Sequence, residues 1–322
     1  MRIIVHGVGA IGGVVAAALA HSGVAVIGIA RGAQLQAIQN AGLTLRAPSG
    51  DIHAEFSCVG SPSEIAFAKD DVILLAVKTQ DTHQALADLR AAGVAEQPIF
   101  CLQNGVENER IALRSFPNVH AATVMMPASY LKPGEVVTYG TPCFGMLDIG
   151  RYPGGSDTAD EQLAKVLCAA NIETFVSDDI MAAKYGKLLM NTVNMVDALL
   201  GFGNDFGDFP ERLRAEAVAV YQAAGISFNE VKDDPRRQAF LQLTDVDGAP
   251  RLGGSTAQSL ARGTGSIETD YLNGEIVLLG RLHGVPTPLN TRLMALGTEV
   301  SRKGTSAGTM TLAELKDLID GA

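Results

Sequence analysis

The sequence predicts an α/β protein in which a doubly wound, mainly parallel sheet occupies residues 1–177 and an all-helical domain occupies residues 178–322. Three observations support this prediction. Apolar runs of strand length alternate with helical segments in the first part. Asp71–Val77 is continuously apolar after its first residue, as a strand buried on both faces of a parallel sheet would be. After Ser177 the strand patterns stop and helical periodicity replaces them.

The elements can be placed in chain order. In the first part we expect strands at 2–6, 24–30, 71–77, 98–102, 119–126, 135–139, 143–149 and 172–176. We expect helices at 11–21, 33–41 and 80–92, and a hairpin that pairs 43–46 with 52–57. In the second part we expect helices at 179–200, 210–224, 235–243, 255–262, 266–283, 287–303 and 311–320. Thr311 and Glu314 form a capping box for the last of them.

The chain opens with a strand, a glycine-rich turn and a helix. Its glycines have the G-x-G-x-x-G spacing, and the candidate ligand-binding residues are Gly7, Val8, Gly9, Ala10, Ile11 and Gly12. The first glycine permits the tight turn, the second lets the backbone approach a pyrophosphate, and the third lets the helix pack on the strand. The helix N-terminus then faces the phosphates. An ordinary turn in an α/β unit is the alternative, but the flanking strands and helix favour a dinucleotide site of the Rossmann type.

The segment after the second strand indicates which dinucleotide binds. An NAD site usually has an Asp or Glu near the end of that strand to hold the ribose 2′-hydroxyl, whereas an NADP site has a cation there. Residues 1–50 contain neither Asp nor Glu, and the strand is followed by Arg31. The planar guanidinium of Arg31 suits a 2′-phosphate, although a solvated arginine is the alternative for this residue alone. Together with the missing acid, Arg31 favours NADPH.

The composition excludes several classes of partner. The formal charge is −10 and no run of Lys and Arg occurs, so we expect no nucleic-acid or membrane partner. No segment is as long and as uniformly apolar as a membrane span, and none is typical of a signal peptide. The four cysteines lack metal-binding spacing and the histidines do not cluster. We therefore expect a reducing, cytoplasmic compartment and no metal, and the sequence allows a homodimer.

The first expected helix of the second domain carries a narrow polar stripe. On a continuous helix over 179–200, Lys187, Asn191 and Asn194 fall within about 60° of one another. Such a stripe is usually a snorkelling cation beside solvated amides, but a helix directly after a nucleotide domain can present it to an interdomain cleft. Hydride transfer to a carbonyl carbon leaves an alkoxide, which an ammonium stabilises and protonates. We predict Lys187 as this acid, with Lys184 as its rival.

Two later helix starts carry candidate substrate ligands. Glu268 lies in an expected first turn, where an acid normally compensates the helix dipole. A carboxylate at that position is also able to orient a substrate hydroxyl or the lysine. Ser255 and Thr256 follow two glycines and are able to present hydroxyls to a substrate carboxylate, although capping a helix is the more common use of such residues. His283, next to Gly284, is interpreted as a C-terminal cap and not as a ligand.

Taken together, these motifs resemble the ketopantoate reductase family, also called the 2-dehydropantoate 2-reductases, which are Rossmann enzymes with a helical second domain. The resemblance covers nearly the whole chain. It depends on Gly7–Gly12, Arg31, Ala76–Lys78, Leu102–Gly105, Lys187–Asn191, Ile267–Gly274 and His283–Asn290. Each segment alone is weak evidence for the family, but all of them occur here in the order in which the family has them.

The resemblance implies roles for the matching residues. It implies that Lys187 is the catalytic acid and that Glu268 is the partner that binds the substrate hydroxyl. It places Lys78 near the cofactor. It also places Asn104 near both the nicotinamide ribose and the substrate.

The resemblance also implies substrate contacts, and here the sequence departs from the family pattern. Asn191 matches a substrate-binding position, and Thr256 stands where the family has a carboxylate-binding serine. The family commonly has a second Asn four residues after the first, but Met195 occupies that place and Asn194 precedes it. The stretch Ser255–Ser259 also differs from the usual one. Both changes concern the identity of the keto acid more than the hydride chemistry.

The sequence therefore predicts an NADPH-dependent reductase of a small 2-keto acid, in the first place of ketopantoate to pantoate, with Lys187 as general acid. A paralogous reductase of another keto or hydroxy acid, or of an opine-type substrate, is the second interpretation. A non-catalytic protein that senses NADPH is the third. It ranks below the others because it gives Lys187 and Glu268 no purpose.

Overall fold

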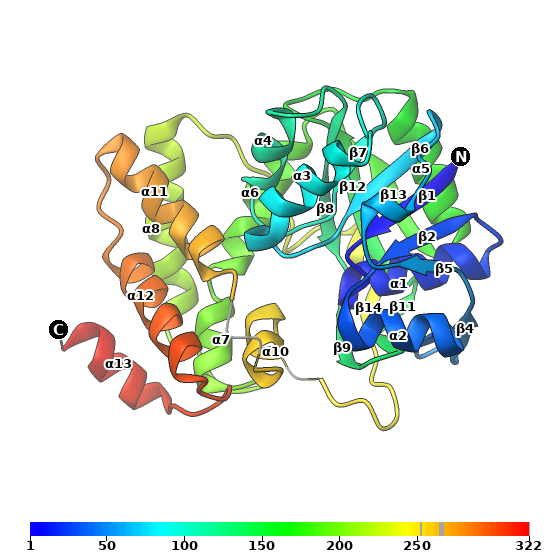
Figure 1. The fold of residues 1–322 in the computed structure, drawn as a ribbon. Coiled ribbons are helices and arrows are strands. Elements are labelled where there is room, and N and C mark those ends of the chain that lie inside the picture. The colour runs from blue at the N-terminus through cyan, green and yellow to red at the C-terminus, as the bar shows by residue number, and fades with distance from the viewer. Residues whose placement is uncertain (252, 264–266, 322) are drawn as a thin grey trace. The chain divides into compact units, whose positions relative to one another are not determined.

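The computed structural model describes residues 1–251, 253–263 and 267–321. The chain divides into two compact units, which are described separately below. Unit 1 contains Met1–Ala183 and Asp233–Pro250, and unit 2 contains Lys184–Lys232 and Arg251–Ala322. Unit 1 holds the sheets and unit 2 is helical (Figure 1).

An eight-stranded sheet forms the centre of unit 1, in the order β13–β12–β8–β7–β6–β1–β2–β5 (Figure 1). Neighbouring strands are parallel except at the antiparallel pair β8–β12. The bounds are β1 Arg2–His6, β2 Val26–Ile29, β5 Ser57–Val59, β6 Asp71–Leu75, β7 Ile99–Cys101, β8 Val119–Met125, β12 Gly145–Arg151 and β13 Ile172–Val176. Because β7, β6, β1 and β2 are parallel neighbours, the segments that follow them leave the sheet at one edge.

Apolar cores lie on both faces of this sheet because consecutive residues inside its central strands are apolar. In β1, Ile3 and Val5 belong to one core and Ile4 belongs to the other, as the alternation of side chains along a strand requires. Helices cover both cores, and their bounds are α1 Ala10–His21 and α5 Thr158–Ala169 for the first, and α3 Thr82–Ala91 and α4 Asn108–Leu113 for the second. The doubly wound sheet expected from the sequence is confirmed.

Smaller elements complete unit 1. The expected hairpin is present as antiparallel β3–β4, within a second sheet of order β4–β3–β10–β9. A short pair, β11–β14, is also antiparallel. The bounds are α2 Gly32–Ala41, β3 Leu43–Arg46, β4 Ile52–Ala54, η1 Pro62–Glu64, η2 Thr79–Asp81, β9 Ala128–Lys132, β10 Glu135–Thr138, β11 Gly140–Pro142, α9 Arg236–Phe240 and β14 Leu241–Leu243.

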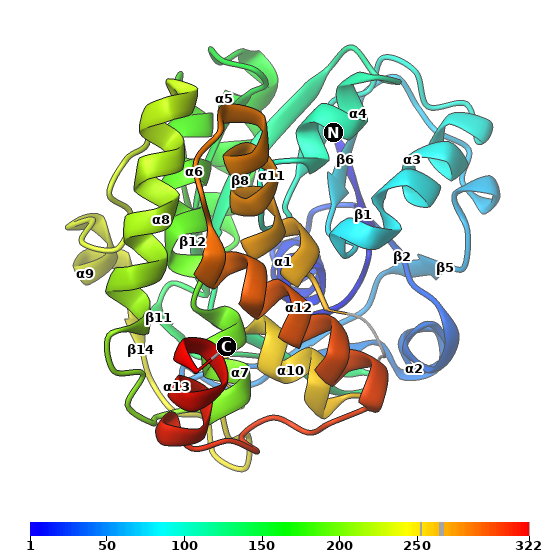
Figure 2. The same cartoon turned by 90° about the vertical axis from the view of Figure 1, so that its left-hand side faces the viewer.

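Unit 2 is a helical assembly in which α8, α11 and α12 pack against one another, as the view in Figure 2 also shows. Its largest described core contains Met195, Leu199, Phe209, Leu213 and Leu293. The capping box of Thr311 with Glu314 is present at the start of α13. The bounds are α6 Ile180–Asn191, whose first turn belongs to unit 1, α7 Asn194–Leu200, α8 Phe209–Ala224, α10 Ser255–Ala261, η3 Thr269–Tyr271, α11 Asn273–His283, α12 Pro288–Lys303 and α13 Leu312–Asp320.

Three expected helices were wrong in part. The helix expected over 179–200 is broken between α6 and α7, so the calculated stripe of Lys187, Asn191 and Asn194 does not lie on one continuous helix. The helix expected over 266–283 is a 3-10 turn followed by α11, and its first residue lies outside the described part of the chain.

The segment expected as a helix over 235–243 ends in the strand β14, because Leu241–Leu243 pairs with β11 of unit 1. The prediction of a purely helical second part is therefore corrected at this strand. Asp233–Pro250 belongs to unit 1 although it follows the predicted boundary at 177. The chain therefore passes from unit 1 to unit 2, back to unit 1 and again to unit 2, and a single boundary in the sequence does not describe this.

Candidate active site

The glycine-rich turn after β1 has the backbone geometry that a dinucleotide loop needs. Gly7 has φ +106°, and a Cβ there would lie 2.7 Å from the nitrogen of Val77. A Cβ on Gly12 would lie 2.1 Å from the carbonyl oxygen of Gly7. A Cβ on Gly9, by contrast, would meet no atom within 4 Å. Gly7 and Gly12 are therefore required by the fold, whereas Gly9 leaves space at the N-terminus of α1.

The start of α1 suits a negatively charged ligand. Gly9 is the N-cap and makes no side-chain capping bond, and the first turn contains no acidic residue. The first backbone N–H groups of a helix lack intrahelical acceptors and carry partial positive charge. The residues present thus fit the pyrophosphate of a dinucleotide, and Gly7, Val8, Gly9, Ala10, Ile11 and Gly12 are the residues that would surround it.

Helix α2 holds this loop and also carries Arg31. Gln34 Nε2 donates a hydrogen bond of 3.0 Å to the Val8 carbonyl, and its Oε1 accepts one of 2.8 Å from the Gly134 N–H. Gln34 is buried, so both ends of its amide are satisfied inside unit 1. Arg31 is the N-cap residue of the same helix. Gln34 therefore fixes the position of the glycine loop relative to Arg31.

Arg31 has an acidic neighbour that the sequence argument did not foresee. Its Nη2 lies 3.6 Å from Oδ1 of Asp81, and both side chains are largely exposed to solvent. Asp81 ends η2 after β6, a strand that neighbours β1 on the side opposite to β2. The absence of acids from residues 1–50 thus does not mean that Arg31 is remote from a carboxylate.

A buried polar network holds the segments that carry Lys78 and Asn104. Lys78 follows β6 and Asn104 follows β7, and both are half-buried. Asn108 Nδ2 donates to the Asn104 carbonyl at 3.1 Å and to Thr79 Oγ1 at 3.2 Å. The Thr82 hydroxyl donates to Asn108 Oδ1 at 2.7 Å. The two segments are therefore joined by side chains that are almost fully buried, which fixes Lys78 and Asn104 at one edge of the sheet.

In unit 2, the turn of α6 that carries Lys187 is held by close contacts. A Cβ on Gly186 would lie 1.8 Å from the carbonyl oxygen of Asn229, so only glycine fits there. The Tyr221 hydroxyl donates a bond of 3.2 Å to the Tyr185 carbonyl. Lys187 is half-buried, whereas Lys184 is 3% exposed. The backbone directly before Lys187 is thus fixed by Tyr221 and Asn229 of unit 2.

The break between α6 and α7 is held by a buried side-chain hydrogen bond. Asn273 Nδ2 donates to the carbonyl of Thr192 at 2.8 Å and to Asn290 Oδ1 at 3.0 Å. Asn290 Nδ2 in turn donates to Glu216 at 2.8 Å. The carbonyl of Thr192, which lies between the two helices, receives a side-chain donor. Asn273 and Asn290 belong to two of the segments on which the sequence resemblance depends. Here they hold the turn between α6, which ends at Asn191, and α7, which begins at Asn194.

The residues near this break differ in burial and in the polar atoms that are available to bind a ligand. Asn191 is half-buried, and its Oδ1 is buried without a hydrogen-bond partner. A Cβ on Gly254, the N-cap of α10, would lie 3.5 Å from Asn194 Oδ1, so Asn194 adjoins the segment that leads into Thr256. Thr256 itself is 2% exposed. Met195 is fully buried, with its sulfur 3.8 Å from the Thr269 hydroxyl, so it belongs to the core.

Glu268 is the N-cap residue of η3 and is half-buried. Its neighbour Thr269 contacts Met195 of α7. A Cβ on Gly297 of α12 would lie 3.1 Å from Thr269 Oγ1. These contacts fix the backbone of Glu268 against α7 and α12. Glu268 does not open a long helix, so compensation of the dipole of such a helix does not account for it.

Comparisons with known families and structures match most of this chain. Residues 3–154 match the family described as ketopantoate reductase PanE/ApbA, and residues 179–300 match its C-terminal part. A 2-dehydropantoate 2-reductase from Pyrococcus horikoshii is 29% identical over 92% of this chain and 96% of its own. A crystal structure of a PanE/ApbA family ketopantoate reductase from Ralstonia eutropha has a TM-score of 0.79 and 32% identity, and covers 94% of this chain and 99% of that one.

The chain belongs to the ketopantoate reductase family. It is an oxidoreductase that acts on a CH–OH group of a small molecule, as the curated 2-dehydropantoate 2-reductases do. Members of this family use NADPH. A ternary structure of D-mandelate dehydrogenase with NADH and anilino(oxo)acetate has the same fold, with a TM-score of 0.78 at 22% identity over 94% of this chain and 99% of that one.

Three residues that sequence reasoning missed hold segments that carry candidate site residues of this ketopantoate reductase. Gln34 holds the glycine loop, Asn108 joins the segments after β6 and β7, and Asn273 binds the helix break. A sequence signal existed for Asn273, because it lies within a segment that resembles the family. Gln34 and Asn108 gave no comparable signal, because a polar residue in an amphipathic helix is normally solvated.

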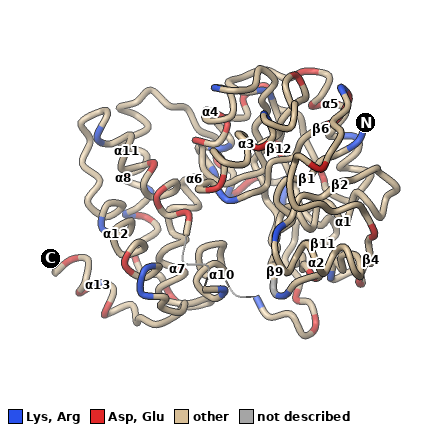
Figure 3. The backbone as a smooth tube through the Cα atoms, in the orientation of Figure 1, with Lys and Arg blue, Asp and Glu red and all other residues tan. Residues whose placement is uncertain are grey.

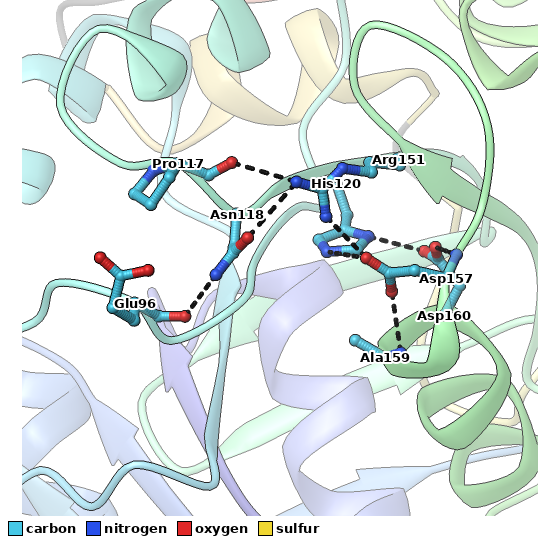
Figure 4. A network of polar contacts seen from close by, with 8 residues as sticks. All are labelled: Glu96, Pro117, Asn118, His120, Arg151, Asp157, Ala159 and Asp160. Atoms are coloured by element: carbon cyan, nitrogen blue, oxygen red, sulfur yellow. Dashed lines mark hydrogen bonds and ion pairs between the residues drawn. The ribbon is translucent and has the colours of Figure 1, made fainter.

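One group of described residues outside the site has side chains of the types that bind metals. His120, Asp157 and Asp160 bring ligand atoms within 4.8 Å of one another in unit 1 (Figure 4). The carboxylate oxygens already accept hydrogen bonds: Asp157 from Arg151 at 2.7 Å and from Ala159, and Asp160 from the Asp157 N–H. His120 Nδ1 lies 2.8 Å from the remaining oxygen of Asp160. This group caps α5 and ties it to β8.

The distribution of charge is mixed over both units. Lys and Arg positions are interspersed with Asp and Glu positions along the chain (Figure 3). Among the described residues, no helix combines the length and apolar character that crossing a membrane requires.

Proposed function

We propose that this ketopantoate reductase reduces 2-dehydropantoate to pantoate with NADPH, and that Lys187 donates the proton. The fixed turn of α6 carries this proposal, because Gly186 and the Tyr185 carbonyl are held by Asn229 and Tyr221 directly beside Lys187. An ammonium on a rigid turn suits a proton donor, because proton transfer depends on a held geometry. The resemblance of Lys187–Asn191 to the family motif supports the same role.

Residues of unit 1 support the choice of cofactor. The open space at Gly9 and the first N–H groups of α1, which lack intrahelical acceptors, suit the pyrophosphate. Arg31 suits the 2′-phosphate, and Lys78 and Asn104 are held at the same edge of the sheet by Asn108. When bound, the reduced nicotinamide supplies the hydride that reaches the keto carbon.

Residues of unit 2 are assigned to the substrate. Lys187 stabilises the negative charge that develops on the substrate oxygen and then protonates it. Glu268 is proposed to accept a hydrogen bond from a substrate hydroxyl. Asn191 has a buried Oδ1 without a partner, which supports a polar contact with a ligand. Asn194 and Thr256, joined through the Gly254 segment, are proposed to complete the substrate-binding set.

The test is the initial rate of NADPH oxidation with 2-dehydropantoate. Lys187→Ala is expected to lose on the order of 100-fold or more in kcat while its Kd for NADPH changes little, because a general acid acts in the reaction step. Lys165→Ala, an exposed lysine on α5, is the matched control. Normal turnover by Lys187→Ala, together with loss of turnover in Lys184→Ala, would assign the proton to the rival lysine. Absence of turnover by the wild type with 2-dehydropantoate, but turnover with another keto acid, would reject the substrate.

The cysteines support the expected reducing, cytoplasmic location. Cys58, Cys101 and Cys143 are buried and Cys168 is exposed, and none of these four described residues forms a disulfide. The homodimer that the sequence allows stays a prediction, which sedimentation of the purified protein would test.

A further inference from the structure

Arg31 and Asp81 follow the two strands that flank β1, the strand that leads into the glycine loop. Arg31 follows β2 and Asp81 follows β6, and these strands flank β1 in the sheet. The Nη2 atom of Arg31 lies 3.6 Å from Oδ1 of Asp81. An acid brought in by the neighbouring strand thus stands beside the cation that is proposed to receive the 2′-phosphate of the cofactor.

We propose that Asp81 is a specificity-determining residue that lowers the preference of this enzyme for NADPH over NADH. This inference depends on the proposed function, because it takes Arg31 as the ligand of the 2′-phosphate. The Asp81 carboxylate competes with that phosphate for the guanidinium donors and repels its charge. NADH carries a neutral 2′-hydroxyl at the same place, so the carboxylate does not repel it and is able to accept its hydrogen bond.

A capping hydrogen bond does not engage the carboxylate of Asp81. It is the N-cap residue of α3, where Asp is common because its side chain caps the helix. In this structure, however, Asp81 makes no side-chain capping bond. Its contact with Arg31 joins two exposed side chains, with 75% and 44% exposed, and such pairs stabilise a fold little. The carboxylate is therefore available to act on a ligand of Arg31.

His6 does not add a positive charge that would make up for the negative charge of Asp81 beside Arg31. His6, at the end of β1, is buried, and burial lowers its pKa to about 4 in spite of the nearby acids. His6 is therefore neutral at neutral pH. Asp81 thus offsets the charge of Arg31, and no charge on His6 compensates for it.

The experiment measures the Kd of NADPH and of NADH separately, from the fluorescence of the bound nicotinamide at one fixed ionic strength. Asp81→Asn is expected to tighten NADPH binding by about three- to tenfold, because it removes one screened charge beside a phosphate dianion. Its Kd for NADH is expected to stay the same or rise. Arg31→Met is expected to weaken NADPH more than NADH, which checks that the 2′-phosphate lies at Arg31.

The matched control is Glu161→Gln. It removes the same charge from an exposed position on α5, which packs on β13 at the other end of the sheet from β2. Its NADPH/NADH ratio of Kd values is expected to equal that of the wild type. An unchanged ratio in Asp81→Asn, an equal change in Glu161→Gln, or an unchanged ratio in Arg31→Met would each overturn the proposal.

The binding measurement separates this inference from the proposed reaction. If Asp81→Asn changes the ratio while the wild type fails to reduce 2-dehydropantoate, the specificity role stands and the proposed reaction is wrong. If the wild type binds neither NADPH nor NADH, both are wrong.

Discussion

Asn273 donates a hydrogen bond of 2.8 Å to the main-chain carbonyl of Thr192, and so ties the start of α11 to the break between α6 and α7. The same amide contacts Asn290 at 3.0 Å, and both Asn side chains are almost completely buried. A carbonyl at a helix end needs a donor, and a buried one is costly to leave without it. This contact therefore stabilises the turn that separates Asn191, at the end of α6, from Asn194, at the start of α7.

Asn273→Ala is expected to lower the free energy of unfolding by about 2–4 kcal/mol, because two buried acceptors lose their donor and a small cavity remains. Urea unfolding followed by circular dichroism measures this. Asn273→Asp is expected to lose at least as much, because a carboxylate cannot donate to the Thr192 carbonyl. Asn40→Ala, an exposed position on α2, is expected to stay within about 0.5 kcal/mol of the wild type. Equal losses for Asn273→Ala and Asn40→Ala would show that the contact does not hold the break.

The glycine loop allows a test that separates folding from ligand binding. Gly12→Ala is expected to destabilise the protein, because its methyl group would lie 2.1 Å from the carbonyl oxygen of Gly7. Gly9→Ala is expected to unfold at nearly the same urea concentration as the wild type, because its methyl group meets no atom within 4 Å. It is nevertheless expected to bind NADPH at least about tenfold more weakly, since the added group enters the space left for the pyrophosphate.

The two measurements for this pair are urea unfolding without ligand and titration with NADPH. If Gly9→Ala bound NADPH as tightly as the wild type, the pyrophosphate would not lie against this turn. If Gly12→Ala were as stable as the wild type, the close packing of α1 on the turn would be wrong.

The first unit could be predicted well because its signals are local and its topology follows a rule. The strand, turn and helix around Gly7–Gly12 carry their own pattern, and parallel neighbours bring Arg31, Lys78 and Asn104 to one edge of the sheet. The contact of Arg31 with Asp81 could not be predicted, because it depends on which side of β1 the later strand β6 joins.

The second unit was harder because distant residues decide its local structure. The apolar periodicity continues through Thr192, and the break there depends on Asn273, which lies 81 residues later. In the segment that returns to unit 1, Leu241–Leu243 is too short to indicate a strand by itself, and its pairing with the distant β11 decides its conformation. The candidate residues Lys187 and Glu268 came from chemistry and resemblance, while the surroundings that hold them came from the structure.

Asp157 gives unit 1 a dependence on pH through its contacts with Arg151 and His120 (Figure 4). Burial alone raises the pKa of this carboxyl, but the hydrogen bond from Arg151, the charge of His120 and backbone N–H groups outweigh burial and lower it. A carboxyl with a lowered pKa in the folded state stabilises the protein above its ordinary pKa, and this stabilisation is lost as the pH falls through the lowered value.

Asp157→Asn keeps a side-chain oxygen to cap Ala159 but removes the charge that faces Arg151. The variant is therefore expected to be less stable than the wild type at pH 7, and the difference between the two is expected to shrink as the pH falls from about 5 to about 3. Urea midpoints across this range measure the difference, with Asp51→Asn, a largely exposed carboxylate, as the control. A difference that stays constant over the whole range would show that the Asp157 carboxylate does not stabilise the folded chain through its charge, and that its capping geometry alone fixes the start of α5.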